Sequence, residues 1–312
     1  EVQACADVPT GVVAWWRAED DAADAIGVNS GSLVGGAGFT PGLVGEAFVF
    51  DGIDDYVRIP NGPALNPTGS FSIEMWIFPT DDRFSNIYSK WGDGGPWSNQ
   101  RAYQISKTDG HGLEFAISDD AHQGDSGFHK FDITGVLTLN TWNHVAGVYE
   151  QPTGTRFIYV NGVEVGRRVD PPIVVTNSMA DVALGVGLLA PSAFRAPFAG
   201  AMDEASFYDR ALTSFEIDAI YQAGSGGKCG PDADEDGFSV FMDCDDSNPT
   251  VFPGALQLCD GLNNDCGDPA WPAVPAAETD SDGDGHRLCS GDCDDSLASV
   301  YPDAPQTCDG VN

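Results

Sequence analysis

The chain has 312 residues, enough for one large domain and a smaller one or for two ordinary domains. Its 42% hydrophobic and 10% aromatic content is typical of a folded globular protein, not of a disordered acidic chain. The formal net charge of −34 argues against nucleic acid or an anionic membrane surface as a partner, and no apolar run reaches the roughly 18 residues that a membrane-inserted helix needs.

The first residues, EVQACADVPTG, contain neither the basic nor the apolar region of a signal peptide. We therefore expect that a signal peptide has already been removed. Residues 1–9 are interpreted as an N-terminal extension.

Short apolar runs separated by turn residues then predict antiparallel β-structure. In residues 71–78 (FSIEMWIF), Phe71, Ile73, Met75 and Ile77 occupy every second position. This alternation has the two-residue period of a strand. Asn161-Gly162 predicts a two-residue hairpin, since both positions tolerate positive φ. The expected strands are 12–16, 46–50, 56–59, 71–78, 101–105, 113–117, 142–150, 156–160 and 202–209.

One helix is expected at residues 214–221, where Thr213 and Glu216 match a capping box and Ile217 and Ile220 lie in an apolar stripe. About a dozen short strands with one small helix predict an all-β sandwich or jelly roll.

Six segments together resemble the successive blocks of the laminin-G-like, concanavalin A-like jelly roll. They are GVVAWWRAED, VFDGIDDYVRIP, GSFSIEMWIFP, TWNHVAGVYE, FIYVNGVEVG and MDEASFYDRALTSFEIDAIY, and the resemblance covers about residues 10–224 in the family's order. Lectins, adhesion modules, accessory domains of enzymes and structural proteins share this fold, so the resemblance leaves the function open.

The resemblance implies that a calcium ion is held between acidic strand ends, with Asp51 or Asp203 as ligands. The alternative is that Asp51-Gly52 only forms a turn. Trp91 and Trp97 flank a glycine-rich loop and are candidates for a ligand-binding, sugar-stacking platform; core packing is the alternative.

No catalytic constellation is evident. Residues 124–127 (GDSG) resemble the loop around a serine-protease nucleophile, but Phe128 follows them and no matching His and Asp motifs accompany them. Glu74 lies in a strand, yet Ser72 and Trp76 stand where a glucanase needs a second acid. We expect a protein that is not an enzyme.

Composition changes at a Gly/Ser linker, residues 225–228. Beyond it, residues 229–312 form an acidic double repeat, in which 232–266 aligns with 280–312.

Asp-x-Asp-x-Asp-Gly is the start of a calcium loop of the EF-hand type, whose twelfth position closes the coordination shell of the ion with another acid. That acid is Asp243 in the first copy, whereas Asp292 falls at position 13 of the second. The predicted metal ligands of the tail are Asp232, Asp234, Asp236, Phe238, Asp243, Asp245, Asp280, Asp282, Asp284, His286, Asp292 and Asp294.

The tail resembles MopE-type metal-binding repeats and, more loosely, thrombospondin type 3 calcium repeats. The first resemblance implies copper, but hard carboxylate oxygens suit Ca²⁺, and the tail has a single histidine. Calcium is the predicted cofactor; a solvated acidic linker without an ion is the alternative.

Eight cysteines, without a paired zinc-type spacing, predict disulfides and an oxidising compartment. Cys5 precedes the jelly roll and Cys308 lacks a following partner, so a head-to-tail link between chains is one hypothesis. The alternative hypothesis is that Cys5 pairs with a tail cysteine of the same chain, or that the sequence is a fragment of a longer protein. The cysteines are Cys5, Cys229, Cys244, Cys259, Cys266, Cys289, Cys293 and Cys308.

The sequence thus predicts a secreted or cell-surface calcium-binding protein with a structural or adhesive role. Its partner is an extracellular protein, a glycan or another copy of itself. A lectin-like module or an accessory domain of a larger secreted enzyme is the alternative.

Overall fold

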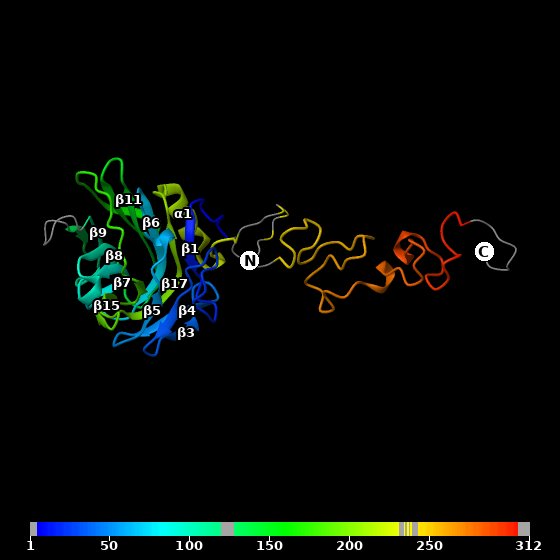
Figure 1. Ribbon diagram of the computed structural model, residues 1–312, viewed down its shortest axis with the longest axis horizontal. Coiled ribbons are helices and arrows are strands. Elements are labelled where there is room, and N and C mark those ends of the chain that lie inside the picture. The colour runs from blue at the N-terminus through cyan, green and yellow to red at the C-terminus, as the bar shows by residue number, and fades with distance from the viewer. Residues whose placement is uncertain are drawn as a thin grey trace. The chain divides into compact units, whose positions relative to one another are not determined.

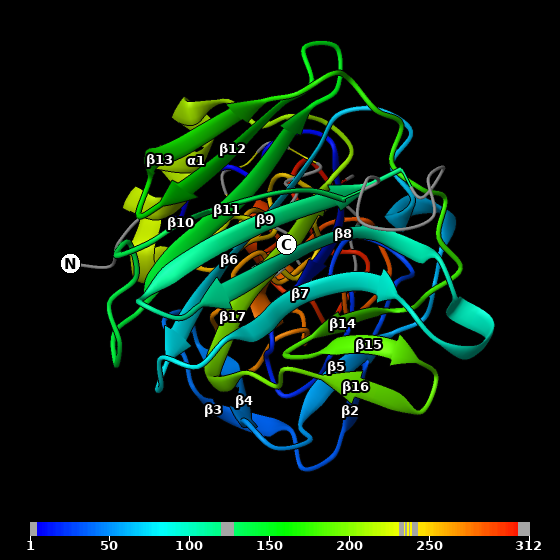
Figure 2. The ribbon, with the colours of Figure 1, turned by 90° about the vertical axis from the view of Figure 1, so that its left-hand side faces the viewer.

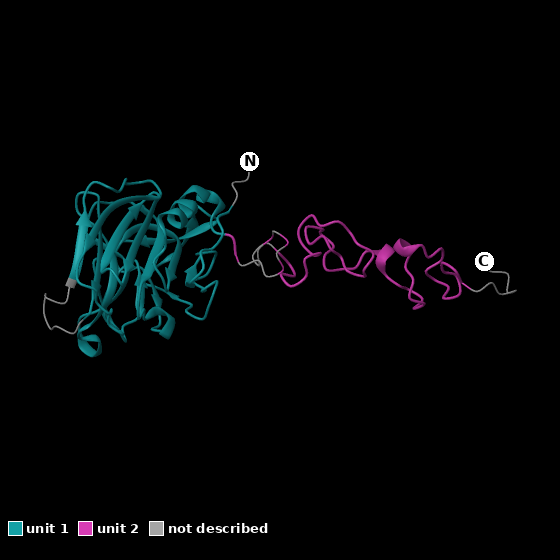
Figure 3. Ribbon diagram, turned by 90° about the horizontal axis from the view of Figure 1, so that it is seen from above, with its two compact units in different colours: residues 1–228 teal, residues 229–312 magenta. Residues whose placement is uncertain are grey.

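The computed structural model describes residues 5–119, 128–230, 234, 236, 238 and 243–304. The chain divides into two compact units, residues 1–228 and 229–312 (Figure 3). We call the first the sandwich and the second the tail, and describe each by itself.

The sandwich consists of two antiparallel sheets, one of eight and one of seven strands in the described part of the chain (Figures 1 and 2). The large sheet has the order β13 (Val163–Val169), β12 (Thr155–Val160), β11 (Asn143–Glu150), β6 (Phe71–Pro79), β17 (Ala199–Tyr208), β4 (Glu46–Asp51) and β3 (Gly38–Pro41), with β1 (Val12–Trp16) also paired to β17. The small sheet has the order β10 (Phe128–Ile133), β9 (Gly112–Ser118), β8 (Gln100–Thr108), β7 (Ser85–Gly92), β14 (Val182–Leu184), β5 (Tyr56–Ile59) and β2 (Ser32–Val34). A separate hairpin is formed by β15 (Gly187–Ala190) and β16 (Ala193–Arg195).

The core lies between the two sheets and follows the alternation of the strands. Phe71, Ile73, Met75 and Ile77 of β6 are all fully buried in it, as the period-two pattern predicts. Asn161 and Gly162 both have positive φ, 50° and 77°, and confirm the predicted hairpin between β12 and β13.

Helix α1 (Ser214–Ala223) packs on the outer face of the large sheet. Thr213 and Glu216 form the predicted capping box, and the helix ends two residues beyond its predicted limit. Ile217 and Ile220 pack against Tyr208, so a second apolar layer covers β17.

The nine expected strands are present, but β7 was not predicted. Its sequence SNIYSKWG is polar, yet all eight residues are buried. The outer face of β7 lies against β15, which places polar side chains such as Asn86 and Ser89 out of contact with solvent. Pattern analysis misses such a strand because it expects polar residues to face water.

In the tail, the described residues contain no α-helix and no strand, and short 3₁₀ turns take their place. Disulfides and side-chain hydrogen bonds hold this unit together. In the described ranges, the 3₁₀ turns are Pro63–Leu65, Gly95–Trp97, Gly224–Gly226, Ala276–Glu278 and Leu288–Ser290. None of the helices in the described ranges is long and apolar enough to cross a membrane.

Candidate metal centres

The first repeat of the tail brings three carboxylates together. Ligand oxygens of Asp234, Asp236 and Asp243 all lie within 4.8 Å of one another. Oδ1 of each accepts a backbone N–H two residues further on: from Asp236 at 3.3 Å, from Phe238 at 2.8 Å and from Asp245 at 3.0 Å. These turns orient the side chains, as expected for aspartate in a tight loop.

The second oxygens of these carboxylates remain for a ligand. Oδ2 of Asp236 and of Asp243 is buried and has no hydrogen-bond partner among the described residues. A buried carboxylate oxygen without a donor is costly, and clustered negative charges add mutual repulsion. Both costs disappear when a cation lies between the oxygens. Asp232, predicted as the first ligand, lies outside the described residues.

The second repeat has the same arrangement. Oxygens of Asp280, Asp282 and Asp284 also lie within 4.8 Å of one another. Oδ1 of Asp282 and of Asp284 accepts the N–H two residues on, at 3.1 and 2.8 Å, while Oδ2 of each is buried without a partner in the described ranges. Asp280 accepts N–H donors from the glycines at 283 and 285, at 2.7 and 3.0 Å.

Asp292 lies close enough to the second group for its charge to act on Asp282, although closure of a metal shell by Asp292 stays a prediction. It is 5% exposed; its Oδ1 accepts the Asp294 N–H at 3.0 Å, and its Oδ2 is buried without a described partner, as in Asp243. Burial raises the pKa of Asp282, and the charges of Asp284, Asp292 and Asp280 raise it further. Asp292 therefore contributes to the same negative field as the other three carboxylates.

The remaining predicted tail ligands have visible structural roles. The Phe238 ring stacks on Phe252 at 4.9 Å between centroids, and the equivalent His286 ring stacks on Tyr301 at 4.8 Å. Asp245 and Asp294 accept hydroxyl hydrogen bonds of 2.6 Å from the serines two residues on. Metal ligation by these four residues stays a prediction.

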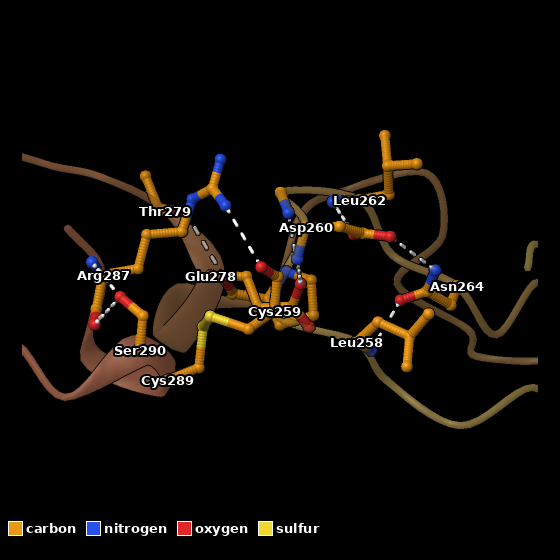
Figure 4. Close-up of a disulfide and its surroundings, with 12 residues drawn as sticks. Leu258, Cys259, Asp260, Leu262, Asn264, Glu278, Thr279, Arg287, Cys289 and Ser290 are labelled. Carbon is orange, nitrogen blue, oxygen red and sulfur yellow. Dashed lines mark hydrogen bonds between the residues drawn. A yellow bond between two sulfur atoms is a disulfide. The ribbon is translucent and has the colours of Figure 1, made fainter. Parts of the chain in front are cut away.

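Disulfides fix the tail around these loops. Cys244 pairs with Cys266, and Cys259 with Cys289, which joins the first repeat to the second. Figure 4 shows the second bridge, beside which Arg287 donates to the Cys259 carbonyl at 3.3 Å. Glu278, also drawn there, accepts backbone N–H donors from Asp260 and Gly261 at 3.3 and 3.4 Å.

Asn264 is a central structural residue that the sequence analysis missed. It is fully buried, and its Oδ1 accepts the Leu258 N–H at 2.8 Å. Its Nδ2 donates to Thr250 and Asp260 at 3.4 and 3.2 Å. Asn264 thereby links three parts of a segment that has no sheet. The sequence does not reveal this role, because asparagine is common among turn residues.

Cys5 and Cys229 are disulfide-bonded, as predicted, which disfavours the hypothesis of an unpaired Cys5 that links chains. The prediction of a disulfide at Cys293 is wrong. Among the described cysteines, Cys293 is the free one, and it is exposed. Cys308 lies outside the described residues.

In the sandwich, acidic oxygens of Asp51, Asp54 and Asp55 also cluster within 4.8 Å. Hydrogen bonds account for this group: Asp51 accepts the Ile53 N–H at 2.7 Å, and Asp55 accepts those of Gly36 and, at 2.9 Å, Asp51. The turn interpretation therefore explains the positions, and calcium at Asp51 stays a prediction.

Asp203, the other predicted ligand in the sandwich, is fully buried. Its Oδ2 accepts the N–H groups of Leu43 and Val44, both at 2.9 Å, and its Oδ1 has no partner in the part of the chain described. Burial, followed by the charge of Glu204, raises its pKa to about 8. Asp203 is not a member of any of the three carboxylate clusters found among the described residues, so its role as a ligand stays a prediction.

Of the two interpretations of Trp91 and Trp97, the structure supports core packing and not an exposed platform. They are only 4% and 7% exposed. Trp97 packs with Ala180 and Leu188 in a small apolar cluster, and the guanidinium of Arg58 lies 5.8 Å from its ring centroid. Trp91 is the last residue but one of β7, so it belongs to a strand and not to the loop.

Glu74 sits in a buried ionic cluster that the sequence did not reveal. Lys228 Nζ lies 3.0 Å from Glu74 Oε1 and 3.2 Å from Glu204 Oε2, and His144 Nε2 lies 3.1 Å from Glu74 Oε2. Burial alone would raise the pKa of Glu74, but Lys228 and His144 lower it to about 2. The side chain is inaccessible to a substrate. The serine at 126, in the protease-like loop, lies outside the described residues.

Comparison with family models finds two matches. The model for the concanavalin A-like lectin/glucanases superfamily (Laminin_G_3) matches residues 50–218. The model for the metal-binding motif Cu-binding_MopE matches residues 243–269 and 292–311. The second match supports a metal in the tail without identifying the ion. No curated protein matches the chain.

Solved structures share the sandwich fold at low sequence identity. Domain 4 of AbnA, an extracellular arabinanase from Geobacillus stearothermophilus in complex with arabinotriose, is 23% identical with a TM-score of 0.50, over 66% of this chain and 96% of that one. The binding domain of Paraclostridial Mosquitocidal Protein 1 is 17% identical with a TM-score of 0.52, over 68% and 52%. The binding domain of botulinum neurotoxin serotype D is 10% identical with a TM-score of 0.51, over 68% and 51%. This chain spans about half the length of the two toxin domains.

Proposed function

Because the chain belongs to the concanavalin A-like lectin/glucanases superfamily, we propose that it is a non-enzymatic, extracellular binding or adhesion protein whose tail folds around calcium ions. The sandwich presents the binding surface. The disulfides of the tail are typical of an oxidising compartment outside the cell.

One observation carries the calcium assignment. In both repeats, equivalent aspartates direct one oxygen to the backbone and leave the other buried without a described donor, at Asp236 and Asp243 and at Asp284 and Asp292. Carboxylate oxygens at this spacing are the ligands that Ca²⁺ prefers, whereas copper and zinc prefer imidazole or thiolate. His286, stacked on Tyr301, is not part of either acidic group in the described residues.

Limited proteolysis with and without chelator tests this proposal. An ion that binds only the folded tail adds about 2.7 kcal/mol of stability at a hundredfold excess over Kd. Chelator is expected to make residues 229–312 sensitive to protease, and calcium to restore their resistance. Equal cleavage rates under both conditions would contradict the proposal.

Carbohydrate binding is the second candidate. It is favoured by the similarity to an arabinanase domain solved with arabinotriose. The two toxin binding domains show that the same fold also occurs in protein modules named for binding. A glycan array with the calcium-loaded chain distinguishes this candidate from a purely structural role.

Assembly into a fibre has weaker support than the sequence suggested. Cys5 is already bonded; among the described cysteines the free one is Cys293, which takes the place of Cys244 in the second repeat and is available for an interchain disulfide. A reductant-sensitive ladder on electrophoresis that is absent in Cys293→Ser would support covalent assembly. A monomer band under non-reducing conditions would exclude it.

A further inference from the structure

The outer face of the large sheet, which lies behind the small sheet in the view of Figure 2, carries two hollows that share Trp142. The first, of about 440 Å³, is lined by residues of β3, β4, β6 and β17. The second, of about 380 Å³, is lined by Leu43, Trp76 and the C-terminal end of α1. Each volume is within the usual range of ligand sites. Because Trp142 lines both hollows, we call the two together the Trp142 groove.

Strand register explains why the sheet is hollow here. Gly38, Val49, Ala201 and Phe78 are direct partners across β3, β4, β17 and β6, so they form one row on the outer face. Their neighbours along the strands point the other way and pack in the core: Phe50, Met202 and Ile77. Three small side chains thus stand beside the large ring of Phe78, whose centroid lies 5.6 Å from that of Trp142. The two rings form a wall beside an apolar floor.

The first hollow has few hydrogen-bonding groups. The polar side chains of its described lining are those of Thr40, Asp51 and Thr80, and the others are apolar. Phe78 and Trp142 are only half-buried. Apolar surface with a polar rim is typical of contacts with another protein, and aromatic residues are enriched in such contacts. The hollow therefore suits an apolar side chain of a partner protein.

Each hollow has its own source of negative charge. The exposed carboxylate of Asp51 lines the first. Gly224 lines the second and follows the last turn of α1, which contains no basic residue. The C-terminal end of a helix carries a partial negative charge that a cation stabilises. None of the described residues that line the two hollows is lysine or arginine. Arg83 lies beside Gly52, but its guanidinium is paired with Asp81 at 2.5 Å.

The charge of the whole chain decides between a second copy and a different protein as the occupant. At a net charge of −34, a second copy is repelled and a basic partner is attracted. Lysine and arginine also match the lining, because their apolar stems pack on aromatic rings while their charged heads reach a carboxylate.

We propose that the Trp142 groove binds an extended, basic segment of a partner protein. An apolar residue of that segment packs against Trp142, and its basic residues face Asp51 and the C-terminal end of α1. The inference rests on the binding role proposed above and names the partner's chemistry; it requires neither a saccharide nor metal in the tail.

Selection from a phage-displayed library of random peptides tests it, with the intact, calcium-loaded chain as the target. The enriched peptides are expected to share lysine or arginine close to apolar residues. The consensus peptide, made with a fluorophore, is then titrated with the chain by fluorescence anisotropy. Failure to enrich any sequence, or a consensus without lysine or arginine, would overturn the proposal.

Three substitutions locate the contact. Ala201→Phe fills the floor of the groove and Trp142→Ala removes the shared ring, so each should weaken binding of the consensus peptide at least tenfold. Asp51→Asn should weaken it about two- to fivefold, as expected for an exposed ion pair. Asparagine keeps an oxygen that can accept the Ile53 N–H, a bond of 2.7 Å in the native turn.

Asp132→Asn is the matched control, because it removes the same charge from an exposed position on β10, in the other sheet. It should leave binding unchanged. Unchanged affinity in both Ala201→Phe and Trp142→Ala, or equal losses in Asp51→Asn and Asp132→Asn, would overturn the proposal. Calcium uptake is measured on the same samples, so that retained uptake without peptide binding refutes the groove alone.

Discussion

Lys228 is held inside the sandwich by two carboxylates and by the Glu204 carbonyl, to which its Nζ donates at 2.9 Å. Burial opposes the charge on Lys228, but Glu204 and Glu74 outweigh it and keep its pKa above the ordinary value. Lys228, which the sequence places in a glycine-rich linker, is therefore held in a defined position. The sequence indicates its charge but not its two partner residues, because Glu74 and Glu204 come from strands far apart in the chain.

Replacing Lys228 is therefore expected to be severe. Lys228→Met leaves Glu74 and Glu204 buried without their cation, which should lower the free energy of unfolding by about 3–5 kcal/mol. Arg168→Met is the control, because its ion pair with Asp170 involves a side chain that is 55% exposed. That change should cost less than about 1 kcal/mol in denaturant titration. Equal effects of the two changes would contradict the role of the cluster.

The same cluster predicts how stability depends on pH. Glu74 has a folded pKa of about 2, below its ordinary value of 4.5, so the unfolded chain binds its proton first. Its contribution is full above pH 4.5 and is lost as the pH falls toward 2. Thermal unfolding between pH 7 and pH 2 should show this loss, and Glu74→Gln should reduce the slope. An unchanged slope in the variant would contradict the assignment.

Among elements, α1 shows how well local signals can predict a structure. Thr213 Oγ1 accepts the Glu216 N–H at 3.3 Å and the Glu216 carboxylate accepts the Thr213 N–H at 2.8 Å. Thr213→Ala should destabilise the sandwich by about 1 kcal/mol, and Thr213→Ser should not, since it keeps the hydroxyl. Denaturant titration measures both; equal stability of the two variants would argue against the cap.

β6 and β7 are both buried on two faces, yet only β6 was predictable. The sequence of β6 alternates without interruption between core residues and residues of the other face. In β7 the register shifts between Asn86 and Tyr88 and again between Lys90 and Trp91, so no period-two pattern survives.

The tail loops were predictable in the positions of their acids but not in their closure. The Asp spacing placed Asp236 and Asp284 correctly in acidic groups. The extra residue before Asp292 left its role open; the side chain is buried, and its role as the closing ligand stays a prediction. Disulfide pairing could not be derived either, since spacing alone allows many connectivities.

For the whole molecule, the account predicts two independent unfolding events. The sandwich has a continuous apolar core and should melt without regard to calcium. In the tail, the buried apolar residues described are few, Val251, Ala255 and Val300, so its stability should depend on the ion and the disulfides. Calorimetry with and without chelator should shift one transition only; a shift of both, or of neither, would contradict this division.

Calcium titration by calorimetry tests the central claim most directly. The intact chain is compared with the double variant Asp236→Asn/Asp284→Asn and with Asp268→Asn, which removes a charge in the tail outside both acidic groups. We predict saturable binding by the intact chain and by Asp268→Asn, and at least a tenfold loss of affinity in the double variant. Absence of binding by the intact chain, or equal affinities in all three proteins, would contradict the account.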